Sequence, residues 1–367
     1  MTTNHAPQVR LAPGSPEVLA LFESGRRAYL DSATYGLPPR PTVDALRRAL
    51  LDWQTGAANW EEDWEPAGEL CRQEIAPMLG APPEEIALVP AVSVGIAPVA
   101  AALGAQDELV VPDDEFHSLL LPLLALAERR GARVRRVPFA EVADAVGPRT
   151  TLVATSHVRS NGGAVQDLDS VAARAAEVGA RVVVDATHAA GLLPIDASRR
   201  GLDVVVAAAY KHLLCPRGVA FARIAPDAQR AYAPVSASWV SVDPRTFYGD
   251  GADRLAADAR RFDVSLAWHA WVGAVESLRF LNTIPDEERR GWSVALASEL
   301  ATRLGLEPTG SSFLGVPVRV TLGELAGRLA EADVAAAIRD GEVRVSFHVY
   351  NTPADVDYAA EVLEPLR

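Results

Sequence analysis

The sequence predicts an α/β protein in which a mostly parallel sheet of seven strands is flanked by helices and followed by a smaller α+β domain. Two observations predict this class. Short apolar runs rich in Val alternate with helical patterns through the middle of the chain, as in repeated βαβ units. With 367 residues, 49% of them hydrophobic, the chain can also bury a large core and form more than one domain.

Seven short apolar runs have the usual length of a β-strand. They span residues 84–90, 107–113, 132–139, 150–156, 180–186, 202–208 and 218–224. Helical patterns separate them, for example residues 168–180, where we expect Asp169 or Ser170 to cap the helix and Gly179 to end it. Several strands are followed by Asp, His, Ser and Gly, which places these residues at the carboxyl edge of the sheet, where open α/β folds bind ligands.

Regular periodicity is lost between residues 225 and 265, where Pro, Ser and Gly accumulate. We therefore expect a large domain over residues 29–250 and a small carboxyl-terminal domain over residues 251–367, with residues 1–28 as an N-terminal arm of the small domain. The small domain contains the remaining helical and strand patterns, at residues 268–281, 293–305, 315–322, 342–350 and 355–366.

The composition favours a small-molecule partner. The formal net charge is −13 and the arginines are scattered, which argues against nucleic-acid binding. Cys71 and Cys215 are the only cysteines, too few for a disulfide framework and too far apart for a metal motif. No apolar run resembles an export signal or reaches spanning length, so we expect a cytoplasmic protein with no membrane partner and no metal.

Lys211 is the only lysine in the chain, and the other 34 basic residues are arginines. An arginine would serve equally well as a surface charge, but a guanidinium stays protonated and cannot become an amine nucleophile. A single retained lysine therefore indicates amine chemistry. The obvious reaction is a Schiff base with a carbonyl cofactor such as pyridoxal 5'-phosphate, and the alternative is an ordinary half-buried lysine in an arginine-favouring proteome.

Three further features fit a phosphorylated pyridine aldehyde. Ser93 and the amide of Val94 open a helix after the first strand, where a phosphate can bind. Asp185 ends a buried-looking strand, with His188 three residues later, and a carboxylate facing a pyridine nitrogen keeps that nitrogen protonated. Arg344 lies on a late strand, where its guanidinium can hold a substrate carboxylate.

These motifs resemble the class V aminotransferase and cysteine desulfurase superfamily. The resemblance runs from YLDSATYGLPP at residues 29–39 to VRVSFHVYNTPADVD at residues 343–357, so it covers nearly the whole chain. It implies the fold of a type I pyridoxal-phosphate enzyme, with a large cofactor-binding domain. It also implies a homodimer with shared active sites and a small amino-acid substrate.

The resemblance assigns the cofactor's partners residue by residue. Lys211 matches the lysine that forms the internal aldimine, Asp185 the partner of the pyridine nitrogen, and His188 the residue on the ring-hydroxyl side. Phe116 matches the aromatic that stacks on the ring, where desulfurases have histidine, and His117 is next to it. Tyr210 matches the phosphate-side residue just before the lysine.

The remaining assignments concern the substrate and the phosphate. Ser93 matches the phosphate-binding hydroxyl, and Arg344 the arginine that binds the substrate carboxylate. Ser160 or Asn161 falls where the family contacts the ring hydroxyl or the substrate carboxylate. Ser265 lies where a residue crosses the dimer interface to the partner's phosphate, although the family's usual threonine is replaced here.

For the reaction, the pattern around Asp185 and Phe116 is more similar to kynureninases, isopenicillin N epimerase-like proteins and carbon–sulfur lyases than to the aminotransferases. We expect a lyase of natural-product biosynthesis that removes a β-substituent from a cysteine S-conjugate or a similar amino acid. The alternatives are a class V aminotransferase, a decarboxylating oxidative deaminase, and a catalytically silent binding protein of the same fold. No cysteine precedes the strand of Arg344, so we do not expect a persulfide-forming desulfurase.

Overall fold

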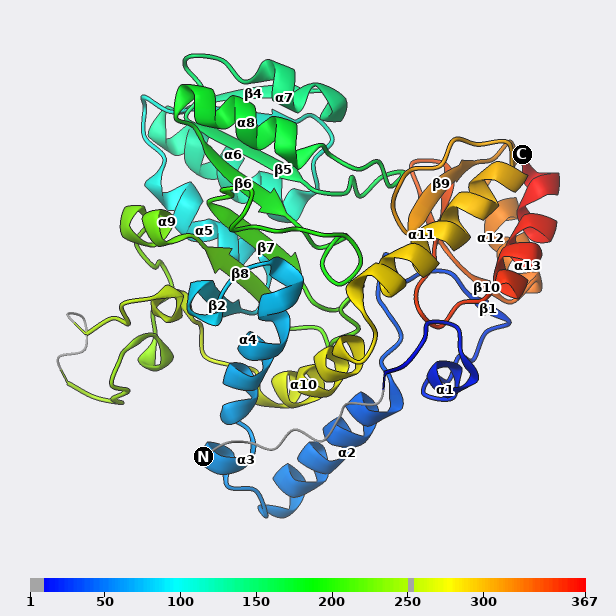
Figure 1. The fold of residues 1–367 in the computed structure, drawn as a ribbon, viewed down its shortest axis with the longest axis horizontal. Helices are drawn as coiled ribbons and strands as arrows, with labels where there is room; N and C mark the ends of the chain where they lie inside the picture. Colours follow the sequence, from blue (N-terminus) through cyan, green and yellow to red (C-terminus); the bar gives the residue numbers. More distant parts are fainter. Residues whose placement is uncertain (1–9, 250–253) are drawn as a thin grey trace.

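The computed structural model describes residues 10–249 and 254–367 and has seven strands in one central sheet (Figure 1). Their order across the sheet is β2–β8–β7–β6–β5–β3–β4. Strand β8 runs antiparallel to both of its neighbours, and the other pairs are parallel. The predicted mostly parallel seven-stranded sheet is therefore confirmed. The strands are β2 (Ile86–Val89), β3 (Glu108–Pro112), β4 (Arg133–Val137), β5 (Leu152–Ser156), β6 (Arg181–Asp185), β7 (Val204–Ala208) and β8 (Ala220–Ile224).

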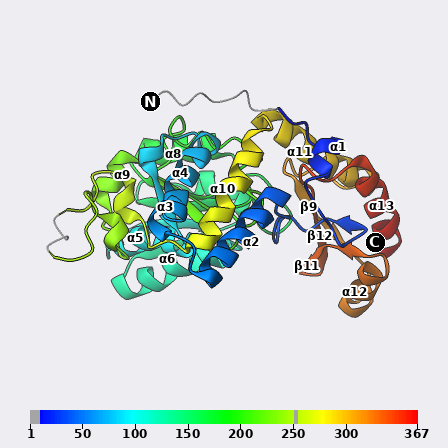
Figure 2. The ribbon, with the colours of Figure 1, turned by 90° about the horizontal axis from the view of Figure 1, so that it is seen from below.

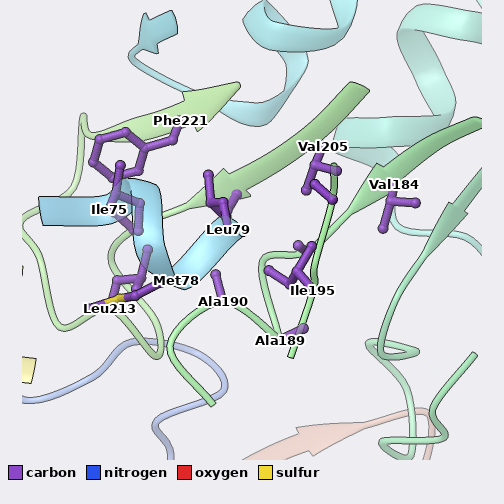
Figure 3. Close-up of a cluster of buried hydrophobic side chains, with 14 of the residues drawn as sticks. Ile75, Met78, Leu79, Val184, Ala189, Ala190, Ile195, Val205, Leu213 and Phe221 are labelled. Atoms are coloured by element: carbon purple, nitrogen blue, oxygen red, sulfur yellow. The ribbon is translucent and has the colours of Figure 1, made fainter. Parts of the chain in front are cut away.

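Both faces of this sheet are covered by helices, which explains why its central strands are apolar throughout. Successive residues of β6 illustrate this, because Val184 belongs to one core cluster and Val183 to the other. Figure 3 shows the first cluster, in which Ile75 and Phe221 pack together. Full burial of each such side chain stabilises the fold by about 1.5–3 kcal/mol. The first cluster includes residues of α4 (Pro66–Leu79), α7 (Val142–Ala145), α8 (Leu168–Val178) and α10 (Trp268–Asn282); the second includes residues of α5 (Val92–Ala102), α6 (His117–Arg130) and α9 (Pro226–Ala231).

Helix α8 begins at Leu168, the first residue of the predicted pattern, but its cap lies two or three residues before the predicted ones. Its cap is Asp167, whose side chain accepts the backbone N–H of Ser170 at 3.1 Å, rather than Asp169 or Ser170. The predicted stop is correct, since Gly179 ends the helix with a left-handed φ of 74°. The predicted caps were therefore wrong: Asp167, Asp169 and Ser170 are all residue types that cap helices, and only the backbone geometry distinguishes them.

A second, smaller lobe lies beside the sheet and contains its own core (Figures 1 and 2). A short parallel pair, β1 (Ala28–Tyr29) and β10 (Val334–Ala335), joins the start of the chain to this lobe. The strand predicted at residues 315–322 is shifted and shorter, because it ends at Pro317, which has no N–H to donate. The lobe contains β9 (Phe313–Pro317), β11 (Ala337–Arg339), β12 (Glu342–Ser346), α11 (Asp286–Arg303), α12 (Leu322–Glu331) and α13 (Pro353–Leu363).

Helix α10 lies alongside α2 (Arg40–Thr55) and links the two lobes (Figure 2). The predicted domain boundary at residue 250 and the first nine residues of the predicted arm lie outside the described residues. Within the described ranges, no helix is both long and apolar enough to cross a membrane. The two other short helices are α1 (Pro16–Leu19) and α3 (Trp60–Asp63).

Candidate active site

Lys211 lies in the tight connection between β7 and β8, at the edge of the sheet where β5 and β6 also end. The connection is closed by backbone hydrogen bonds, from Leu214 N–H to the Lys211 carbonyl and from Cys215 N–H to the Ala209 carbonyl. Gly36 packs against it: its N–H donates to the Tyr210 carbonyl at 2.9 Å, and a Cβ at Gly36 would lie 2.3 Å from the Lys211 carbonyl oxygen. The lysine backbone is therefore fixed from both sides.

The Lys211 side chain is 6% exposed and points into a cavity lined by polar residues from several strand ends. Its Nζ lies 2.9 Å from His188 Nε2 and 5.2 Å from the centre of the Phe116 ring. Burial lowers the pKa of Lys211 to about 7, although the nearby Asp185 carboxylate opposes this shift. Lys211 is therefore available as a neutral amine near neutral pH, as a nucleophile requires.

Asp185 is the last residue of β6 and is buried beneath the same cavity. Its Oδ1 accepts the Thr187 N–H at 2.8 Å. Burial raises the pKa of Asp185, while the hydrogen bonds with Thr187 and the charge of Lys211 lower it. A protonated ring nitrogen next to Asp185 would supply a positive charge that stabilises the buried carboxylate.

His188 is buried as well, and burial together with Lys211 lowers its pKa well below the usual value. The ring is therefore neutral. Its Nε2 contacts Lys211, whereas its Nδ1 has no hydrogen-bond partner within the described chain. A buried ring nitrogen without a hydrogen-bond partner indicates that a bound ligand supplies that partner.

The amino end of α5 borders the cavity through Ala91 and Val92. Ala91 is the N-cap and has no side-chain acceptor, so the N–H groups of Val92 and Ser93 are free for an anion, whereas the Val94 N–H proposed for the phosphate donates to the Ala91 carbonyl at 3.1 Å. Ser93 and Val94 belong to this first turn. Neither lines the cavity, and Val94 packs against the second core cluster.

A second cavity, of about 490 Å³, opens beside the first and shares Phe116, Ser160, Tyr210 and Lys211 with it. Arg344 lines it and is 4% exposed. Its guanidinium donates to the Ser160 carbonyl at 3.1 Å and to Thr34 Oγ1 at 2.8 Å, and it makes no ion pair with any described carboxylate. Burial, followed by the charge of Arg339, lowers the pKa of Arg344 to about 10. The charge of Asp31 opposes this lowering, but the two side chains form no ion pair, and a buried cation without an ion-pair partner favours an anionic ligand.

The structure brings most of the predicted residues together. Phe116, Ser160, Asp185, His188, Tyr210 and Lys211 line the first cavity, and Asn161 and Arg344 line the second. Asn161 donates through its amide to Asp340 at 2.8 Å. Ser265 is exposed and lines neither cavity. The roles assigned to all these residues remain predictions.

Several residues at the cavities had not been singled out from the sequence. Glu115 is 6% exposed, and it accepts the Ser156 and Phe116 N–H groups, each at 2.7 Å. Burial raises the pKa of Glu115 to about 7, and the charge of Asp185 adds to the rise. Thr187 and Arg217 also line the first cavity. Thr187 could have been noticed between Asp185 and His188, but nothing in the sequence distinguishes Arg217 from the other arginines.

The residues present fit pyridoxal 5'-phosphate on three structural grounds. A buried amine poised to be neutral suits its aldehyde, a buried carboxylate suits its ring nitrogen, and an uncapped helix amino end suits its phosphate. The sheet topology and this lysine define the class of the protein as a fold type I enzyme that uses this cofactor.

The chain belongs to the aminotransferase class-V family, whose model matches residues 28–312. This confirms the predicted superfamily and cofactor. The chain is similar to the uncharacterized aminotransferase YcbU of Bacillus subtilis, with 28% identity over 87% of this chain and 90% of that protein. It is also similar to a probable cysteine desulfurase of Methanothermobacter thermautotrophicus, with 27% identity over 92% of this chain and 94% of that protein.

Among solved structures, the chain is similar to the cystine C-S lyase C-DES, with a TM-score of 0.84 and 21% identity. The match covers 94% of this chain and 98% of that one. It confirms the fold type, over both lobes and nearly the whole chain.

Proposed function

We propose that this protein is a pyridoxal-phosphate-dependent lyase that removes the β-substituent of an α-amino acid, such as a cysteine S-conjugate. The observation that carries the proposal is the position of the buried Lys211 amine, between Asp185 and His188 on one side and the cavity of Arg344 on the other. When bound, the cofactor supplies an electron sink that stabilises negative charge at the Cα of the amino acid.

The residues of the chain would bind the substrate and the cofactor and would transfer the proton. Arg344 would hold the α-carboxylate, since its guanidinium is buried and has no carboxylate partner in the described structure. Lys211 would hold the cofactor, and its neutral amine would accept the proton from Cα. The contact with His188 would keep that amine in position, and burial of all three side chains would exclude water from the reacting atoms.

Loss of a β-substituent, rather than transamination, is supported by two of the proteins to which the chain is similar. One is named a cysteine desulfurase and the other a cystine C-S lyase. We further propose that no persulfide forms on this chain. Cys71 and Cys215 are both buried, burial raises the pKa of each thiol, and neither lines the two cavities.

The alternative that a specific observation favours is transamination, because YcbU is named an aminotransferase. Product analysis distinguishes the two reactions. Elimination from a cysteine S-conjugate consumes one water and releases the thiol, pyruvate and ammonium on every turnover. Transamination releases no ammonium and stops after one turnover unless a second keto acid is added. Continuous ammonium release supports the lyase, and dependence on the added keto acid contradicts it.

Two general features belong to the same proposal. We propose a cytoplasmic homodimer in which Ser265 reaches the partner's site, supported by the exposure of Ser265 and of the apolar side chains Leu51 and Trp53 on α2. We also propose that the protein is catalytically active. Uptake of the cofactor without reaction with any amino acid in a broad panel would instead identify a silent binding protein.

A further inference from the structure

The second cavity has more guanidinium groups in its wall than one α-carboxylate needs. Its wall includes Lys211 and the three arginines Arg217, Arg339 and Arg344. None of these arginines forms an ion pair with a carboxylate in the parts of the chain that the structure describes. Three unmatched guanidiniums around one cavity favour a ligand with more than one negative charge.

The acidic residues of the same wall are already engaged. Asp114 forms an ion pair with Arg159, outside the cavity wall. Glu115 accepts N–H groups from Ser156 and Phe116, as described above. Asp340 accepts the amide of Asn161 at 2.8 Å. None of these carboxylates forms an ion pair with Arg217, Arg339 or Arg344, and Asp31, whose charge acts on Arg344, forms none either.

The hairpin of β11 and β12 sets Arg339 and Arg344 side by side. Ala337 lies directly opposite Arg344 in the register, and Arg339 lies opposite Glu342. Arg339 and Arg344 are thus diagonal neighbours on one face of the sheet, where Cα atoms are about 7–8 Å apart. The small Ala337 opposite Arg344 leaves the space above the hairpin free for a ligand.

Glu342 is the carboxylate that could have neutralised Arg339, since the register places both on one face of the hairpin, but the two form no ion pair. A Cβ built on Gly315 of β9 would lie 2.2 Å from Glu342 Oε2, so this carboxylate rests against Gly315. Arg339 donates only to its neighbouring carbonyl of Ile338, at 2.9 Å, and remains exposed at the cavity. Its charge acts on Arg344, whose pKa it lowers.

The three arginines therefore have separable positions. Arg344 is buried next to Ser160 and is suited to the α-carboxylate. Arg217 lines both cavities and lies over the Tyr210 ring, 5.1 Å from its centre. Arg339 lines only the second cavity, so it is the arginine available to bind the side chain of the substrate.

We propose that Arg339 binds a second anionic group, on the side chain of the substrate, so that the preferred substrates are amino acids whose β-substituent carries a carboxylate or a similar anion. This inference rests on the proposed function, because it assumes that an amino acid binds beside Lys211. It defines the chemical class of the leaving group, which the proposed function leaves open.

A matched pair of ligands tests the proposal. S-carboxymethyl-L-cysteine and its amide, S-carbamoylmethyl-L-cysteine, have nearly the same shape and differ by one charge. Binding to the cofactor-loaded protein is followed by titration of the cofactor's absorbance, and turnover by release of pyruvate. We expect the acid to bind at least about tenfold more tightly than the amide, as one charge-assisted hydrogen bond provides.

Variants then locate the preference. Arg339→Gln should reduce the ratio of acid to amide affinity to near one, and Arg339→Lys should retain part of it. Arg328→Gln, which removes an exposed arginine of α12 far from both cavities, should keep the ratio of the wild type. Arg344→Gln should weaken both ligands.

The outcomes separate this inference from the proposed function. A wild-type protein that binds both ligands equally, or an Arg339→Gln variant that keeps the full preference, overturns the second-anion site and leaves the lyase proposal standing. A protein that takes up no cofactor overturns both. Circular dichroism of each variant verifies that a changed ratio does not arise from misfolding.

Discussion

Replacing Lys211 with methionine should make the cofactor-free protein more stable, even though it removes the proposed catalytic amine. Methionine has a similar length and no charge, so it fits the same buried space. The lysine pKa falls from 10.5 to about 7 because the folded protein buries the amine. The unfolded chain therefore binds a proton at Lys211 more readily than the folded chain does, and that difference opposes folding.

The size of the effect follows from the two pKa values. At pH 7 the burial of Lys211 costs about 4 kcal/mol, and at pH 9 about 2 kcal/mol, at 1.36 kcal/mol for each pKa unit. Between pH 7 and pH 10.5 stability rises with pH, since the unfolded state holds the extra proton; below pH 7 the cost is constant. Losing the contact with His188 returns about 1 kcal/mol. The net gain for Lys211→Met is then about 3 kcal/mol at pH 7 and about 1 kcal/mol at pH 9.

Urea unfolding of both cofactor-free proteins, at one protein concentration and at several pH values, measures this gain. Titrating groups that Lys211 does not influence contribute equally to both proteins and cancel in the difference. The charge of Lys211 lowers the pKa values of Asp185 and His188, so any contribution from these two groups is part of the measured difference. Arg328→Gln serves as the control and should show no pH-dependent difference from wild type. A Lys211→Met variant that is less stable than wild type at pH 7, or a gap that does not shrink towards pH 9, would refute the argument from burial.

Three other variants probe the surroundings of Lys211. Gly36→Ala should displace the loop that holds Lys211, because the new Cβ would lie 2.3 Å from the Lys211 carbonyl oxygen. We therefore expect this variant to lose the cofactor more readily on dialysis, and retention equal to that of the wild type would contradict this. Arg344→Gln should raise the KM for amino acids by about tenfold or more, and an unchanged KM would exclude a carboxylate-binding role. Glu115→Ala, compared with wild type by urea unfolding at pH 5, where the raised pKa of Glu115 costs the folded state only about 1 kcal/mol, should destabilise the protein by about 1–3 kcal/mol. The variant leaves the buried N–H of Ser156 and the part-buried N–H of Phe116 without their acceptor, and a loss below about 0.5 kcal/mol would show that water replaces the carboxylate.

The parts of the fold that the sequence predicts well are those determined by local patterns. All seven strands of the large sheet lie within the predicted runs. The central parallel strands are continuously apolar and rich in valine because both of their faces are buried, whereas the edge strand β4 combines Arg and Val. The strand predicted at residues 315–322 lies at Phe313–Pro317 in the structure. Val316, Val318 and Val320 extend the strand pattern in the sequence, but the strand ends at Pro317. The start of α8 was assigned to the wrong cap because several neighbouring polar residues can cap a helix, and the structure uses Asp167.

The site could be predicted only where composition made a residue unusual. Lys211 is the single lysine, and Asp185 and His188 form a motif close to it in sequence. Arg339 gave no such signal, because its relation to Arg344 depends on a hairpin register that the sequence does not specify. Glu115 was missed because it lies in the loop after β3, while its partner Ser156 is 41 residues away at the end of β5.

The central claim, that Lys211 holds the cofactor covalently, can be tested most directly by borohydride reduction of the loaded protein followed by peptide mass spectrometry. The account predicts one cofactor per chain, attached to the peptide that contains residue 211, and no attachment in the Lys211→Ala variant. Cofactor that binds the native protein but cannot be trapped on this peptide would contradict it.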